Sequence, residues 1–150
     1  MPLKWLRKIQ LVQNQAARLI SGLNRREHIT PTLRSLHWLT VVDRIEFKAL
    51  CLAYRAYHGT GPQYLNSLIT RYTPARGLRS LTAGLVTCPS ARLLTFGGRR
   101  FSVRATALWN SLPVSIRSLP SIMAFRKRIK TCFFEGKAGW VTLVFPVVPW

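Results

Sequence analysis

Apolar residues recur three, four and seven positions apart along most of the chain, a spacing typical of amphipathic helices. The clearest example is residues 3–21, which Gly22 should end because glycine is favoured just past a helix C-terminus. Its apolar face would consist of Trp5, Ile9, Val12, Ala16, Leu19 and Ile20, with Lys4, Arg7, Lys8 and Arg18 on the opposite side. The pattern therefore predicts a mainly α-helical fold that begins with a long amphipathic helix.

Further helices are indicated by the same spacing and by start and stop signals, giving about five or six in total. A short helix should begin with Thr30 as its cap and Pro31 in its first turn, and carry Leu33, Leu36 and Leu39. The others are expected over residues 41–58 (ended by Gly59), from Gly61–Pro62 to Ile69, from Phe101 to Ser111, and from a Ser121 cap to Phe133. The helix over 41–58 is apolar on several sides, so it should be the most buried element.

The helical pattern fades between residues 70 and 98, where two short apolar runs predict a β-hairpin near the middle of the chain. Its strands would be Leu85–Thr87 and Leu93–Phe96. Beyond Gly136 the chain is apolar, interrupted by prolines and without helical period. We therefore expect a small basic helical domain over residues 1–135 and an irregular apolar tail over residues 136–150.

Charge narrows the choice of partner. The chain has 23 Lys and Arg against 4 Asp and Glu, a formal net charge of +19, and like charges at this density repel one another in a compact fold. Such a surface fits a polyanion, either nucleic acid or an acidic membrane. Most of the cations are arginines, whose guanidinium groups bind phosphate through two hydrogen bonds and stack on bases. The composition thus favours RNA or DNA as the partner.

The best candidates for phosphate contacts are the arginines expected in loops and turns, because these side chains are free to reach a backbone. They are Arg25, Arg26, Arg71, Arg76, Arg79, Arg99 and Arg100. Trp38, Tyr72 and Trp109 could stack on bases, although Trp38 and Trp109 are better explained as core residues.

The sequence contains few of the residues and motifs on which catalysis depends. The carboxylates are Glu27, Asp43, Glu46 and Glu135. Only Asp43 and Glu46 are close in sequence, and they are best explained as charges at a helix N-terminus that pair with Arg44 and Lys48 beside them. The three cysteines and three histidines lack metal-ligand spacing, and no phosphate-binding or nucleophile motif is present. We expect no enzyme activity, metal, cofactor or small-molecule ligand. Because the N-terminal residues lack the pattern of a signal peptide, we expect an intracellular protein, nuclear or cytoplasmic, that is not secreted.

A series of short motifs resembles, in order, the region downstream of the polymerase in LINE-type (non-LTR) retrotransposon endonuclease–reverse transcriptases. They are Leu11–Asn14 with Ala16–Arg18, Glu27–Pro31, Leu36–Leu39, Arg44–Lys48, His58–Gly59 with Pro62 and Tyr64–Leu65, Tyr72–Pro74, Leu78–Ser80, Gly97 and Arg99 with Phe101–Ser102, Leu108–Pro113, and finally Phe125, Ile129–Lys130 and Phe133. Thr40 departs from the usual proline and Gly98 from a common acidic residue. The polymerase and endonuclease residues of the family have no counterpart here. The resemblance implies a non-catalytic fragment that helps a reverse transcriptase hold template RNA or target DNA.

Two alternatives follow from the same resemblance: a structural module that docks on the polymerase domain, or a truncated relic of the element without function. Association with a membrane, through basic amphipathic helices and the apolar tail, is the least favoured hypothesis.

Overall fold

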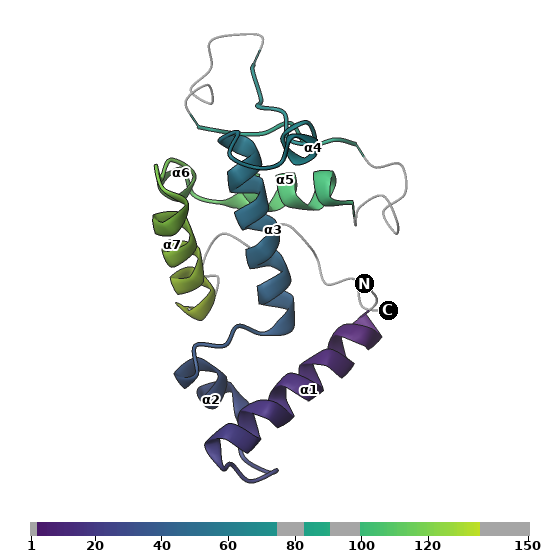
Figure 1. The fold of residues 1–150 in the computed structure, drawn as a ribbon, viewed down its shortest axis with the longest axis vertical. Helices are drawn as coiled ribbons and strands as arrows, with labels where there is room; N and C mark the ends of the chain where they lie inside the picture. The colour runs from purple at the N-terminus through teal and green to yellow at the C-terminus, as the bar shows by residue number, and fades with distance from the viewer. Residues whose placement is uncertain (1–2, 75–82, 91–99, 136–150) are drawn as a thin grey trace. The chain divides into compact units, whose positions relative to one another are not determined.

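The computed structural model describes residues 3–74, 83–90 and 100–135, which form seven α-helices and no strand (Figure 1). The helices are α1 (Leu3–Ser21), α2 (Ile29–Ser35), α3 (Val41–Tyr57), α4 (Gln63–Asn66), α5 (Phe101–Ser111), α6 (Val114–Arg117) and α7 (Ile122–Glu135). The predicted mainly helical class is therefore confirmed. The chain divides into two compact units, Met1–Ile45 and Glu46–Trp150, which are described separately below. The predicted tail over residues 136–150 lies outside the described residues.

The long helices end where glycine can adopt a left-handed backbone. Gly22 has φ 63°, and the Leu23 N–H beyond it donates to the Arg18 carbonyl at 3.1 Å. Gly59 has φ 69° and ends α3 in the same way. Left-handed φ values cost glycine little because it has no Cβ, so both predicted stops are confirmed.

Side-chain hydroxyls cap the starts of α3 and α7. Before α3, the Asp43 N–H donates to Thr40 Oγ1 at 3.2 Å, while the Thr40 hydroxyl donates to Asp43 Oδ2 at 2.6 Å. Ser121 caps α7 as predicted, since its Oγ accepts from the Met123 N–H at 3.2 Å. The predicted Thr30 cap is wrong: α2 begins at Ile29, and it ends at Ser35 because His37 takes the left-handed conformation with φ 54°.

In the first unit, α1 contacts α2, and two glutamines of α1 bond to the backbone that follows α2. The Gln13 side chain donates to the Leu39 carbonyl at 2.8 Å, and the Val41 N–H donates to Gln10 Oε1 at 2.8 Å. Ala17, on the same side of α1, is fully buried. The apolar face predicted from the sequence exists as a stripe, but its large side chains are exposed. Short glutamine-to-backbone bonds therefore decide which side of α1 is covered.

The core of the second unit forms where α3, α5 and α7 meet (Figure 1). Trp109 of α5 is fully buried, with its ring centroid 5.0 Å from that of Tyr57 and 5.8 Å from that of Phe125. Its indole N–H donates to the Gly84 carbonyl at 2.9 Å. Tyr54 of α3 packs on Phe125 of α7, with ring centroids 4.5 Å apart. The prediction that Trp109 is a core residue is thus confirmed.

Two details of the second unit differ from the sequence prediction. The short helix α6 was not predicted; Pro113 ends α5 and directly precedes α6, because proline suits a helix start as well as a helix stop. Of the predicted hairpin, Leu93–Phe96 lies outside the described residues. Val86, in the other half, forms an isolated antiparallel bridge with Arg71 in place of a strand.

Candidate nucleic-acid interface

The arginines predicted as phosphate contacts are only partly described. Arg76, Arg79 and Arg99 lie outside the described residues, whereas Arg25, Arg26, Arg71 and Arg100 are all exposed. Arg25 and Arg26 belong to the first unit, in the turn after α1. Arg18 holds this turn by donating to the carbonyls of Asn24 and Glu27, at 2.7 and 3.0 Å. Arg71 and Arg100 belong to the second unit, so the predicted set is not built on one element.

Arg71 is exposed, and its side chain also contacts the end of α3. Its Nη2 donates to the carbonyl of Tyr57 at 3.0 Å, and its guanidinium lies 4.6 Å from the centroid of the Tyr57 ring. The Tyr57 carbonyl belongs to the last turn of α3, where backbone acceptors lack helical partners and a positive charge is favourable. Arg71 therefore secures the segment after α4 to the end of α3.

The three aromatic residues considered for base stacking differ in access. Trp109 is fully buried, which excludes it as a stacking surface. Trp38 is half-buried in the first unit. Tyr72, with 43% of its surface exposed, is the one of the three whose ring remains accessible beside Arg71.

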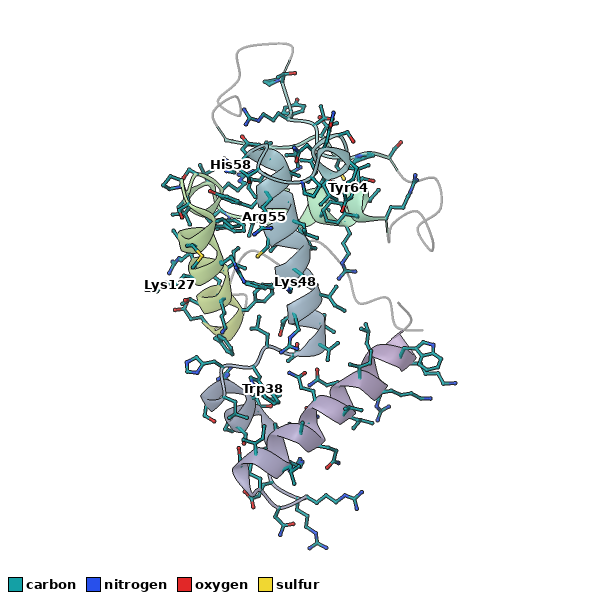
Figure 2. All side chains as sticks on the ribbon, viewed as in Figure 1. Trp38, Lys48, Arg55, His58, Tyr64 and Lys127 are labelled. Atoms are coloured by element: carbon teal, nitrogen blue, oxygen red, sulfur yellow. The ribbon has the colours of Figure 1, made fainter. Side chains whose placement is uncertain are left out.

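A groove between α3 and α7 gathers cations that the sequence did not single out. It has a volume of about 210 Å³ and is lined by Phe47, Lys48, Cys51, Leu52, Arg55, Ile122 and Arg126. Three of these seven side chains are cationic and none is acidic. Figure 2 shows Lys48 and Arg55 on α3 and Lys127 on the neighbouring α7. The groove thus combines positive charge with an apolar lining.

Helix geometry explains why these side chains converge. Lys48 and Arg55 are seven residues apart on α3, which places them on one face and about 10 Å apart along the axis. The side of α3 that flanks the groove packs on α7, because Tyr54 contacts Phe125 and donates its hydroxyl to the Leu119 carbonyl at 2.8 Å. These contacts position the start of α7, and with it Arg126, beside α3.

Electrostatics in the groove is dominated by the three cations. Burial raises the pKa of the Cys51 thiol, while the charges of Arg126, Lys48 and Arg55 all act in the opposite direction. The charges of all three cations therefore favour the thiolate form of Cys51, against the effect of burial. Helix α7 also carries Lys127, Arg128 and Lys130, which are exposed and do not line the groove.

The carboxylates nearest in sequence are engaged elsewhere. Glu46 is 5% exposed and pairs with Arg104 of α5, with 3.1 Å between Oε1 and Nη2. Asp43 bonds to Thr40 at the start of α3. Asp43 and Glu46 therefore take part in two separate interactions, a helix cap and an ion pair between helices.

Sequence reasoning missed the groove because it looked for arginines in loops. The Lys48–Arg55 spacing was visible as a one-face signal on a helix, and the basic run of α7 was visible too. Nothing local indicated that the two would face each other. That information comes from the packing of Tyr54 on Phe125.

Within the described residues, no group of three or more His, Cys, Asp or Glu side chains could hold a metal ion. No helix of that part of the chain is long and apolar enough to cross a bilayer. The chain as a whole matches no protein-family model, no curated protein and no solved structure at a significant level.

Proposed function

We propose that the chain is a non-catalytic nucleic-acid-binding fragment of a retrotransposon reverse transcriptase protein and that the α3–α7 groove contacts the phosphate backbone. One observation carries the proposal: Lys48, Arg55 and Arg126, from two helices, line one groove without an acidic residue. The motifs that resemble the region downstream of a LINE-type polymerase support the same function.

The groove suits a single strand better than a rigid duplex. Proteins that bind single-stranded nucleic acid combine a positively charged groove with apolar or aromatic side chains that contact bases. Here Lys48 and Arg55 provide charges about 10 Å apart along α3, and Phe47, Leu52 and Ile122 provide apolar contact surface. Arginine adds paired hydrogen bonds to phosphate that lysine cannot make.

The absence of catalysis is also part of the proposal. Polymerases and nucleases hold metal ions with clustered carboxylates. Glu46 is committed to Arg104 and Asp43 to Thr40, as described above. A fragment of this kind would act by holding template RNA or target DNA for an enzyme located elsewhere.

The proposal can be tested by fluorescence anisotropy with the full chain and a labelled single-stranded RNA over a range of salt concentrations. The groove variant is Lys48→Gln/Arg55→Gln/Arg126→Gln. The matched control is Arg34→Gln/Lys127→Gln/Arg128→Gln, which removes the same charge from exposed residues that do not line the groove. If the three groove cations each contact one phosphate, the log–log salt slope should become less steep by about 2, since each contact contributes about 0.7 for a single strand.

We expect the groove variant to lose at least about tenfold in affinity at physiological salt, and the control variant to lose much less. Equal losses in the two variants would contradict the proposal, because the chain would then bind only through its overall charge. Competition with duplex DNA of the same length measures the expected preference for a single strand.

A further inference from the structure

Helix α1 exposes a long apolar stripe. Trp5, Ile9, Val12, Leu19 and Ile20 all lie on one side of the helix, and Val12 and Leu19 are 70% and 86% exposed. The helix contacts the rest of its own unit through a different side, the one that carries Gln10, Gln13 and Ala17. Exposed side chains this apolar are costly in water when they form a continuous patch, which marks such patches as interaction surfaces.

The surroundings of the stripe are cationic. Lys4, Lys8 and Arg18 lie on α1, and Arg25 follows in the next turn, whereas α1 contains no acidic residue. Lys8 Nζ lies 4.8 Å from the centroid of the Trp5 ring, so a tryptophan and a cation occupy the same end of the stripe. Tryptophan and lysine are the residues that favour the boundary between lipid headgroups and acyl chains.

The shape of the stripe also indicates its partner. It runs along one side of a single helix, and at its C-terminal half it borders an open hollow of about 670 Å³ lined by Val12, Ala16, Leu19 and Leu23 among others. A fluid acyl-chain layer adapts to so open a surface, and anionic headgroups complement the flanking cations.

We propose that α1 lies in the surface of an anionic membrane, with the stripe inserted among the acyl chains and its cations at the headgroups. From the sequence, a membrane is the least favoured partner, because the apolar face of an amphipathic helix ordinarily packs on its own domain. The structure changes this ranking because another side of the helix makes the contacts within its unit. The proposal concerns residues 3–25 and does not depend on the α3–α7 groove.

The test is flotation of the full chain with vesicles of phosphatidylcholine containing about a third phosphatidylserine. Val12→Gln should reduce the partition coefficient between vesicles and water about tenfold, because it removes one apolar side chain that the acyl chains would otherwise surround. The matched control is Leu11→Gln, which alters an exposed leucine about 100° round the helix from Val12 and should have little effect. All three proteins carry the same charge, so attraction to the headgroups cancels from the comparison.

A second variant tests whether a loss of vesicle binding by Val12→Gln reflects a disturbed fold. Val12→Leu adds one methylene group at an exposed position and should increase the partition coefficient about fourfold. Equal losses for Val12→Gln and Leu11→Gln, or no gain for Val12→Leu, would overturn the proposal. So would self-association in solution that Val12→Gln abolishes without any change in vesicle binding, because the stripe would then serve a protein partner.

Discussion

Replacing Trp109 by phenylalanine tests whether one side chain organises the core of the second unit. The indole is fully buried against Tyr57 and Phe125, and its N–H donates to the Gly84 carbonyl at 2.9 Å. Phenylalanine keeps an aromatic ring in the site but removes the donor and one of the two fused rings. The substitution therefore separates the contribution of the indole from the need for any large apolar group.

The expected loss can be worked out from these contacts. Removing the donor costs about 1 kcal/mol, because the Gly84 carbonyl loses its partner in a buried place. The smaller ring removes apolar contact and leaves a cavity, which costs about 2 kcal/mol more. The sum, about 3 kcal/mol, is a large part of the stability of a small domain.

Urea unfolding followed by circular dichroism measures this loss. For a slope of about 2 kcal/mol per molar urea, the midpoint should fall by about 1.5 M. The control is Trp5→Phe, the same substitution at a half-exposed position, which should change stability by less than about 0.5 kcal/mol. A loss below about 1 kcal/mol for Trp109→Phe, or one equal to that of the control, would refute the assignment of Trp109 as the centre of this core.

Two further predictions concern a helix cap and a histidine. Thr40→Ala removes the hydroxyl that caps α3 and should lower the free energy of unfolding by about 1 kcal/mol, measured with heat or urea. Thr40→Ser keeps the hydroxyl and should be about as stable as the wild type. Equal losses of stability in the two variants would contradict the cap. Burial, and then the charge of Arg71, lower the pKa of His58 below its usual 6.5. The unfolded chain therefore binds the proton more readily, so stability should decrease as the pH falls through 6.5 towards the lower folded-state pKa. His58→Gln should remove this part of the pH dependence, while the other histidines contribute equally to both proteins; an unchanged pH profile would contradict it.

The positions of most helices could be predicted from the sequence, because they depend on interactions within a few residues. Helical spacing defined α1, α3, α5 and α7, glycine ended α1 and α3, and the Ser121 hydroxyl began α7. Phe125, Ile129, Cys132 and Phe133 recur at helical spacing along α7, and all four are buried. Where the local signal was weak or ambiguous, as for α6 after Pro113, the prediction failed.

Contacts between distant segments decided the rest. The pattern of α1 defines an apolar stripe, but hydrogen bonds from Gln10 and Gln13 to the chain near Leu39 and Val41 decide that another side is covered. Likewise, nothing in the short α6 marks Arg117 for burial, yet it is 7% exposed. Such choices depend on partners far along the chain, which a local pattern does not contain.

The candidate sites divide in the same way. The excess of arginine follows directly from the sequence, because charge is a property of composition, and it predicts an anionic partner. That Lys48 and Arg55 share a groove with Arg126 depends on the packing of Tyr54 on Phe125, which brings α7 beside α3. Cationic side chains form a site only when they lie close together in space, and the packing of the core determines which of them do.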